Sequence, residues 1–373
     1  MSQGLGRFLS ITLRVAALVL LAITLLPILD TDQWWVRSLE FPRVQLIVLI
    51  SLVMAGFAVW ERKRSWIWLG ITFVAFGYQV FRVWPFTPLH PVQSVEAESC
   101  PAGSELTLMA SNVLQTNRDY ERTLDLVRNE RPDLFLALET DLPWVEQLDA
   151  LKDEMPYGRT VPIDNTYGMA RYSRLPLDQV EVRYTVEPDA PSMAFGVTLP
   201  GGGHSRVYAL HPRPPIPGKD SGTRDAELVL AGLEVKDDDQ PVIVFGDLND
   251  VAWSPTTRLF QELSGLLDPR VGRGFYNSFN AKLPLLRWPL DHVFHSEHFT
   301  LLRFAVLPAT GSDHFPVLAK FCLDPAEGKA EQDAPKADAG DLENAEEQLE
   351  DGLEQQKEEM AEGEDETDTP EPD

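Results

Sequence analysis

Polar side chains follow three apolar segments that have the pattern of buried strands. "ELTLMASNV" alternates like a strand and ends at Asn112, and "DLFLALE" is almost entirely apolar and ends at Glu139. "PVIVFGDLND" repeats this layout, because its apolar run leads into Asp247 and Asn249. Charged groups are rarely buried without a partner, so they favour the rim of a sheet. We therefore expect these four side chains at sheet edges, where they could act together.

Two further segments place charged residues where a strand begins. "PLDHVFHS" opens a strand with Asp291, and "TGSDHFPVLAKF" sets Asp313 and His314 immediately before an apolar run. Taken singly, each of these polar groups also suits a turn or the first turn of a helix. Their joint occurrence at strand ends favours one shared site.

The oxygen-rich set is typical of a site for a hard divalent cation. Mg²⁺ is usually bound by one or two carboxylates, with water and substrate phosphate completing its octahedron. Asn112, Glu139 and Asp313 offer such oxygens, for Mg²⁺ or alternatively Mn²⁺, and no Cys-rich or His-x-His pattern suggests zinc. His314, if Asp291 orients it, would contact a phosphoryl oxygen or manage its protons.

In order and approximate spacing, these motifs resemble the endonuclease/exonuclease/phosphatase superfamily. The matching segments are "SNV", "LALE", "LHP" with His211, "GDLND", "LDHVF" and "GSDHFPV", and the resemblance extends from about Glu105 to Leu323. This superfamily includes deoxyribonucleases, apurinic/apyrimidinic endonucleases, inositol polyphosphate 5-phosphatases and neutral sphingomyelinases. The resemblance implies an α+β fold, a four-layer αββα sandwich, and a metal-dependent hydrolase acting on ester bonds.

The resemblance also implies a role for each matched residue. Glu139 would be the chief ligand of Mg²⁺, with Asn112 and Asp313 nearby. Asp247 would orient or deprotonate the attacking water, and Asn249 would donate a hydrogen bond to the phosphoryl group. These roles agree with the demands of phosphoryl transfer, which asks a protein mainly for positioning and charge stabilisation.

The remaining matched residues are two histidines and an acid. His314, oriented by Asp291, would contact the phosphate, and His211 would protonate or polarise the leaving group. One position departs from the family pattern, since Leu138 stands before Glu139 where many relatives have Gln. We expect this change to alter the support of the metal ligand without removing the ligand.

Other histidines and arginines in the segment fall outside the motifs. His292 and His295 are interpreted as structural, because only the neighbouring Asp291 lies on a motif. Several arginines could bind substrate anions, although loop arginines more often form surface ion pairs. They are Arg171, Arg174, Arg213, Arg224, Arg273 and Arg287.

The first ninety residues contain three apolar stretches, at about 8–29, 44–60 and 66–84. Each is close to the roughly 20 residues that a helix needs to cross a bilayer. A cleaved signal peptide is the competing interpretation of the first stretch, but a small-residue cleavage site is missing and two more stretches follow. We therefore predict a membrane domain of three transmembrane helices in residues 1–90.

Charges in the short loops predict how these helices are oriented. "ERKR", Glu61 to Arg64, lies between the second and third stretches, and Arg7 precedes the first. Short basic loops stay on the cytoplasmic side. The amino terminus is thus predicted to be cytoplasmic, and three crossings of the inner (plasma) membrane deliver the catalytic domain and the tail to the periplasm.

Beyond the membrane domain the chain changes composition twice. Residues 91–104 have the Pro and polar content of a linker, and residues 105–323 form the predicted catalytic domain. Cys100 and Cys322 flank that domain, and we expect a disulfide between them in an oxidising compartment, with two buried free thiols as the alternative. Residues 324–373 hold −18 of the formal net charge of −26 and no aromatic residue, so we predict a disordered acidic tail.

These features favour a membrane-tethered, Mg²⁺-dependent phosphoesterase at the outer face of the membrane. Tethering suits a lipid-linked phosphomonoester or phosphodiester, because the enzyme is confined to the bilayer surface. A nuclease of DNA or RNA outside the cytoplasm is the second hypothesis, although the catalytic region has no basic run and the acidic tail repels a polyanion. A non-catalytic membrane receptor or scaffold with the same fold is the third. The substrate and the oligomeric state are not predicted.

Overall fold

The computed structural model describes residues 3–29, 31–60, 65–236, 238 and 240–367. The chain divides into two compact units, each described by itself. One comprises Met1–Pro91 and Pro215–Asp220, and the other comprises Val92–Pro214 and Ser221–Asp373.

Three long helices in the first unit occupy the places of the predicted membrane spans. They are α1 (Gln3–Leu25), α3 (Arg43–Trp60) and α4 (Trp66–Val83). All three are long and apolar enough to cross a membrane. Short helical turns accompany them: η1 (Leu26–Ile28), α2 (Trp34–Arg37), η2 (Ser38–Glu40) and η4 (Trp84–Phe86). The basic loop at Glu61 to Arg64, on which the predicted orientation depends, lies outside the described residues.

A buried polar chain links the three helices. Gln79 on α4 accepts a hydrogen bond from Arg43 on α3 at 3.0 Å and donates one to Thr24 on α1 at 3.1 Å. Apolar side chains, including Ile50 and Ala75, pack around these contacts. Polar groups inside an apolar bundle are costly unless they pair with one another. Their pairing here holds the three helices together as one bundle.

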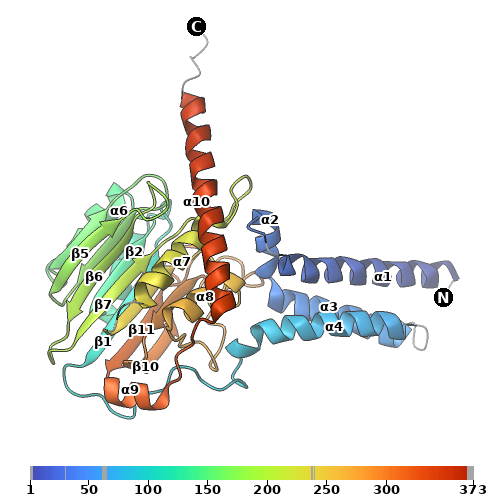
Figure 1. Ribbon diagram of the computed structural model, residues 1–373, viewed down its shortest axis with the longest axis horizontal. Helices are drawn as coiled ribbons and strands as arrows, with labels where there is room; N and C mark the ends of the chain where they lie inside the picture. The colour runs from blue at the N-terminus through green and yellow to red at the C-terminus, as the bar shows by residue number, and fades with distance from the viewer. Residues whose placement is uncertain (1–2, 30, 61–64, 237, 239, 368–373) are drawn as a thin grey trace, which may run out of the picture. The chain divides into compact units, whose positions relative to one another are not determined.

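The second unit is built from two β-sheets (Figure 1). The first sheet has the order β10 (Phe299–Val306), β11 (Val317–Leu323), β1 (Glu105–Asn112), β2 (Leu134–Leu138), β4 (Met169–Ser173) and β3 (Tyr157–Val161). The second has the order β5 (Leu177–Arg183), β6 (Ser192–Thr198), β7 (His204–Leu210), β8 (Val242–Asp247) and β9 (Asp291–His295). Two neighbouring pairs are parallel, β1 with β2 and β7 with β8.

Helices cover the outer faces of both sheets. Side chains of α5 (Tyr120–Glu130) and α6 (Leu142–Leu148), the latter followed by η5 (Asp149–Leu151), pack on the first sheet through Val127 and Trp144. Side chains of α7 (Gly222–Lys236) and α8 (Pro255–Ser264) pack on the second through Leu228 and Phe260. A separate apolar core, which includes Leu136, fills the space between the sheets. The predicted four-layer αββα sandwich is confirmed.

Apolar runs in the sequence explain why the central strands are covered on both faces. Every residue of β2 and of β8 is buried, as expected for strands that have a helix layer on one side and the other sheet on the other. The edge strand β5 is mostly exposed and carries three charged residues, Asp178, Glu181 and Arg183. Parallel strands have their carboxyl ends at the same edge of a sheet, so β1 and β2 end together, as do β7 and β8.

The segment predicted as a linker packs against the catalytic unit instead. Ser94 is buried and its hydroxyl lies 2.7 Å from Nε2 of His295, while Glu96 forms a β-bridge with Leu301. Composition alone suggested a linker because the segment is rich in Pro and polar residues. Gln93 and Ser94 hydrogen-bond with the domain, and the second compact unit begins at Val92, ahead of the predicted boundary at residue 105.

Cys100 and Cys322 form a disulfide, as expected. The bond joins the segment before β1 to β11, and the two cysteines are 222 residues apart in the sequence. Closing so long a loop restricts the unfolded chain strongly. We predict that replacing both cysteines with serine lowers the free energy of unfolding by about 2–4 kcal/mol. Thermal unfolding of the full chain with and without the two substitutions measures this effect, and an unchanged midpoint would contradict it.

The acidic tail is helical rather than disordered. It forms α9 (Pro325–Glu331) and α10 (Ala339–Thr367), and α10 runs beside α7 (Figure 1). Ala345 and Leu349 of α10 join an apolar cluster with Val229 and Leu263. Composition predicted disorder because the tail as a whole has too few apolar residues to form a core. Ala345 and Leu349, four residues apart on one face of the helix, find apolar partners on α7 and α8.

A buried acid on α7 predicts a pH dependence of stability. Glu227 is 3% exposed, and burial, followed by the nearby charge of Glu187, raises its pKa to about 8. A raised pKa favours the protonated acid in the folded state, so stability is lost as the pH rises from the unfolded value towards 8. We predict that Glu227→Gln differs from the wild type by less than about 1 kcal/mol at pH 5 but is about 4 kcal/mol more stable at pH 8.5.

The measurement is thermal unfolding of the full chain at the two pH values. Glu121→Gln, at an exposed position in the first turn of α5, is the matched control and should behave like the wild type at both. An equal effect of Glu227→Gln at pH 5 and pH 8.5 would contradict the titration of Glu227.

Candidate active site

Ends of strands from both sheets converge to form one polar site. Asn112 is the last residue of β1, and Glu139 follows the last residue of β2. In the other sheet, Asp247 ends β8 and lies directly opposite Asp291, the first residue of β9. His314 lies in the loop before β11. Segments of the sequence up to about 200 residues apart are therefore brought together by the pairing of strands.

Asn112 connects the two sheets through its amide group. Its Nδ2 donates hydrogen bonds to Oε1 of Glu139 at 2.8 Å and to Oδ2 of Asp247 at 3.1 Å. Its Oδ1 accepts a bond from the backbone N–H of Leu114 at 3.0 Å. The other oxygen of Glu139 accepts a bond from the backbone of Gln115. Asn112 thus fixes two carboxylates that come from different sheets.

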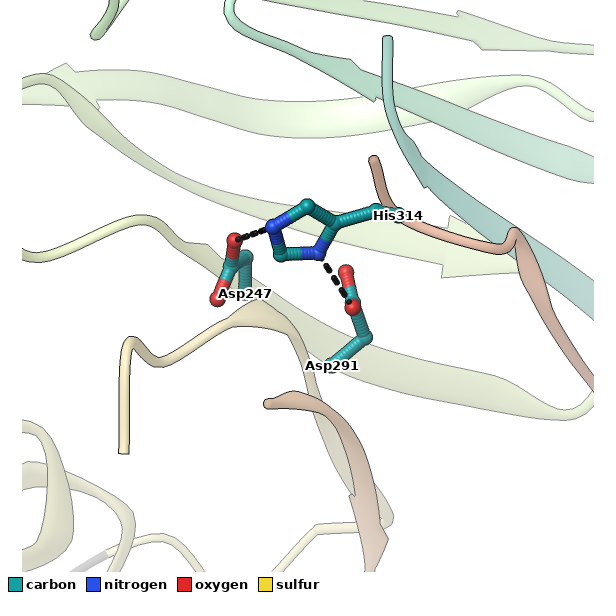
Figure 2. Close-up of side chains that lie close together, drawn as sticks. All are labelled: Asp247, Asp291 and His314. Atoms are coloured by element: carbon teal, nitrogen blue, oxygen red, sulfur yellow. Dashed lines mark hydrogen bonds and ion pairs between the residues drawn. The ribbon is translucent and has the colours of Figure 1, made fainter. Parts of the chain in front are cut away.

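His314 lies between two carboxylates (Figure 2). Its Nδ1 is 2.8 Å from Oδ2 of Asp291, and its Nε2 is 3.6 Å from Oδ2 of Asp247. Burial alone would lower the pKa of His314, but the charges of Asp291 and Asp247 together outweigh it and raise the pKa to about 10. The ring also packs against Phe279, with centroids 4.8 Å apart. The imidazole is therefore held as a cation in a fixed orientation at neutral pH.

His211 is the neutral histidine of the site. It is 2% exposed, and burial lowers its pKa to about 4 although the charge of Asp247 opposes the shift. Among the side chains that the structure describes, none forms a hydrogen bond with its buried Nδ1. A neutral imidazole can exchange hydrogen bonds with a ligand, but it is a poor source of a proton. The geometry thus favours polarisation over protonation in the role expected for His211.

Asn249 and Asp313 are half-exposed at the rim of the site. The backbone N–H of Asn249 donates to Oδ1 of Asp247 at 3.0 Å, and its Nδ2 donates to the carbonyl of Pro212 at 3.0 Å. Asp313 acts on His314 through its charge and accepts a bond from Ser312 at 3.4 Å. Within the described part of the chain, no hydrogen bond joins Asp313 to Asn112.

The backbone around the site adopts conformations that side chains rarely allow. Glu139 has a φ of 60° and Asn249 a φ of 51°, both in the left-handed region. Gly246 has a φ of 147°, and a Cβ there would lie 2.0 Å from the carbonyl oxygen of Leu210. Glycine therefore lets β7 and β8 approach closely, immediately before Asp247. Such strain, maintained at the ends of several strands, is characteristic of functional sites.

The carboxylates of the site outnumber its cation. Glu139, Asp247 and Asp291 surround the single positive charge of His314. Burial raises the pKa of Glu139 and of Asp247, and each further negative charge adds to the shift. This excess negative charge, with the oxygens of Glu139 and Asn112, fits a hard divalent cation.

The protonation state of His314 determines which residues of the site could bind a cation. Asp247, Asp291 and His314 lie close enough to form a metal-binding group. However, a protonated imidazole has no lone pair to offer, and both of its nitrogens face carboxylates. Glu139 is half-exposed and keeps oxygen lone pairs that its two hydrogen bonds do not use. The donor chemistry of Glu139 and Asn112 therefore fits a hard cation better than that of His314 does.

Some supporting residues could not be identified from the sequence. The hydroxyl of Ser278 accepts bonds from the backbone N–H groups of Leu290 and Asp291, and the hydroxyl of Ser312 accepts one from His314. Gln115 supports Glu139 through its backbone. No spacing distinguishes these residues from other polar loop residues, because their roles depend on loops that meet only in the folded chain.

The residues outside the motifs are mostly structural. His292 is fully buried beside Arg270, and His295 pairs with Ser94. Of the six arginines, five contact carboxylates or carbonyls: Arg174 with Glu154, Arg213 with Glu187 and Asp189, Arg224 with Asp225 and Asp250, Arg273 with Glu96, and Arg287 with Asn280. The sixth, Arg171, is the exception.

Comparison with known proteins gives one family match and a common fold. The family described as "Endonuclease/Exonuclease/phosphatase family" matches residues 107–314. The chain is similar to the D. rerio TDP2 structure that contains a single-strand DNA product, with 17% identity, coverage of 58% of this chain and 99% of that chain, and a TM-score of 0.50.

Two other solved structures have lower TM-scores. The human Nocturnin catalytic domain with a bound sulfate is 16% identical, with coverage of 60% of this chain and 95% of that chain and a TM-score of 0.47. The endonuclease/exonuclease/phosphatase from Beutenbergia cavernae is 20% identical, with coverage of 59% and 72% and a TM-score of 0.45. No curated protein sequence matches the chain. At 17% identity, the likeness to D. rerio TDP2 shows the fold alone.

Proposed function

This chain belongs to the endonuclease/exonuclease/phosphatase family and is a metal-dependent hydrolase of phosphoester bonds; from that premise we propose that it is a membrane-tethered, Mg²⁺-dependent phosphoesterase acting on a lipid-linked phosphate at the outer face of the membrane. The observation that carries the proposal is the chain of contacts from Glu139 to His314: hydrogen bonds join Glu139, Asn112 and Asp247, and an ion pair joins Asp247 to His314. It gathers a cation-binding acid, a second carboxylate and a fixed positive charge around one space.

The cation would be held by Glu139 and Asn112, with Asp313 as a further oxygen at the rim. When bound, Mg²⁺ supplies positive charge to the phosphate oxygens. The chain itself contributes the second positive charge, because His314 is protonated and Asp291 holds it in place. Fixed charges of this kind need no reorganisation as negative charge develops on the phosphate.

Asp247 is the residue that would act on the attacking water. Burial raises its pKa, which makes its carboxylate a better proton acceptor than an exposed aspartate. Asn112 and the backbone of Asn249 fix its two oxygens. Asn249 has one further amide hydrogen that is not used by Pro212, and it would donate to the phosphoryl group, while His211 would polarise the leaving group.

Two observations support a lipid-linked substrate. The chain has three helices that are long and apolar enough to cross a membrane. In addition, the loop after Phe279, whose ring contacts His314, exposes three leucines: Leu283 at 50%, Leu285 at 85% and Leu286 at 43%. This loop is bonded to the rim of the site, since the backbone N–H of Ala281 donates to the carbonyl of Asp313. Exposed apolar groups beside a phosphate site suit a substrate with an apolar part.

The full chain, purified in a non-ionic detergent, tests the proposal. It would be assayed with lipid phosphates, lipid phosphodiesters, plasmid DNA and RNA, with Mg²⁺ or with EDTA. We expect metal-dependent turnover of a lipid-linked ester, which EDTA abolishes and added Mg²⁺ restores. Turnover of nucleic acid alone would favour the nuclease, and no metal-dependent turnover of any substrate would favour the scaffold.

The proposed location has its own test. A reporter phosphatase that is active only outside the cytoplasm would be fused to the carboxyl end of the full chain. Activity of this fusion supports three crossings with the catalytic unit outside. An inactive but stably expressed fusion would contradict the proposed orientation without affecting the catalytic assignment.

A further inference from the structure

Arg171 is a buried cation in the space between the two sheets. It lies in β4 with 1% of its surface exposed, two residues after Met169, which belongs to the core between the sheets. Its guanidinium lies over the ring of Phe195 on β6, 4.5 Å from the centroid. Because alternate residues of a strand share a face, Arg171 points into the sandwich rather than towards the helix layer.

The charge of this cation is not balanced within the described part of the chain. Its Nε and Nη1 are buried without a hydrogen-bond partner. Among the side chains that the structure describes, no carboxylate pairs with it, and the charge that acts on it is that of another arginine, Arg159. Arg159 lies directly opposite on β3, so both side chains are on the same face of the sheet. Like charges in directly opposed positions repel.

Other buried arginines of the same unit show how this chain normally compensates such a charge. Arg270 pairs with Asp268 at 2.6 Å, and Arg224 pairs with Asp225 at 2.6 Å. An uncompensated buried charge destabilises the fold strongly, whereas a paired one does not. Burial and Arg159 together lower the pKa of Arg171 to about 10, which leaves it charged at neutral pH. The described residues therefore supply no anion that would balance the charge of Arg171.

A cavity opens at this position. It has a volume of about 550 Å³ and is lined by Arg171, Arg159 and Tyr157 together with the apolar side chains of Leu177, Val180 and Val182. This size is within the range of small-molecule sites, which combine apolar walls with a few polar groups. The cavity is distinct from the catalytic site, because its lining contains none of the catalytic residues and Arg171 pairs with Leu136 in the middle of β2.

We propose that this cavity binds an organic oxyanion, whose carboxylate or phosphate head pairs with Arg171 and Arg159 and whose short apolar chain contacts Leu177, Val180 and Val182. The guanidinium group suits both heads, since it can form paired hydrogen bonds with either. The apolar wall discriminates against inorganic ions, and the two arginines discriminate against neutral molecules. This site is independent of the proposed catalytic function.

Thermal unfolding of the full chain in a non-ionic detergent, with EDTA present, tests the site with three probes. Hexanoate carries both required features, hexanol carries only the chain, and inorganic phosphate carries only the charge. At about ten times its dissociation constant, hexanoate is expected to raise the unfolding midpoint by about 4 °C. Hexanol should give no shift, and phosphate a smaller shift than hexanoate. An equal shift with hexanol or phosphate would overturn the proposal.

Three single-residue variants test whether hexanoate binds in this cavity. Arg159→Glu, at an exposed position, places a carboxylate beside Arg171. This variant should have a higher midpoint of thermal unfolding without ligand, and hexanoate should no longer raise that midpoint. Arg171→Met should also abolish the hexanoate-induced shift of the unfolding midpoint. If Arg171→Met does not fold, Arg159→Glu still tests the site, because a substitution at an exposed position is not expected to prevent folding. His314→Ala should retain the shift. A hexanoate shift that persists in Arg159→Glu, or that is lost in His314→Ala, would show that the anion binds elsewhere.

Discussion

Replacing Glu139 with glutamine is expected to lower kcat by about 10³-fold, because a metal ion contributes several kcal/mol of transition-state stabilisation. Glutamine preserves the volume of the side chain and can still accept a hydrogen bond from Asn112. It removes the negative charge that holds the cation at the end of β2. The loss should therefore be partly overcome by raising the Mg²⁺ concentration. Turnover of the lipid-linked ester as a function of Mg²⁺ measures both effects.

Glu146→Gln is the matched control for this substitution. Glu146 lies on the neighbouring helix α6 and is exposed, so its replacement should leave activity and metal dependence unchanged. A Glu139→Gln variant that retained wild-type kcat and the wild-type Mg²⁺ requirement would show that the cation is bound elsewhere.

The second large effect is expected for His314→Ala, which should lower kcat by about 10²–10³-fold while Mg²⁺ still binds. The substitution removes the positive charge that we place on the phosphate. It also leaves Asp247 and Asp291 facing each other without the imidazole between them. The binding of Mg²⁺ should persist because Glu139 and Asn112 are unchanged. Activity assays and a titration with Mn²⁺ on the same variant separate the two properties.

His204→Ala provides the control for His314→Ala. His204 is in β7 and contacts Asp178 near the surface, so its replacement should leave kcat unchanged. The account of His314 would be contradicted if His314→Ala kept wild-type activity, or if it lost Mg²⁺ binding as completely as Glu139→Gln.

Much of the site could be predicted because each of its residues has a local signature. Asn112, Glu139 and Asp247 follow apolar runs, and short apolar runs favour strands that are covered on both faces. Asp291 begins β9, and His314 lies in the loop before β11, so both are next to apolar runs as well. Strand ends meet at one edge of the sandwich, so the positions of these residues in the sequence predict that their side chains lie close together.

Features that depend on tertiary partners could not be predicted. The tail is helical because Ala345 and Leu349 find an apolar surface on α7 and α8, and composition does not reveal that surface. Likewise, Ser278 supports Asp291 from the loop 13 residues earlier, which folds back to reach it. The unbalanced charge of Arg171 among the described residues follows from the pairing of β3 with β4, which sets it opposite Arg159. Local sequence contains none of these pairings.

The position of the cation is the claim on which the catalytic account depends, and X-ray diffraction from a crystal of the full chain grown with Mn²⁺ tests it most directly. The anomalous signal of Mn²⁺ locates the ion without reference to any assumed ligand. We predict one peak at coordination distance from a carboxylate oxygen of Glu139, with His314 still bonded to Asp291. A peak enclosed by Asp247, Asp291 and His314, with no density at Glu139, would contradict the account.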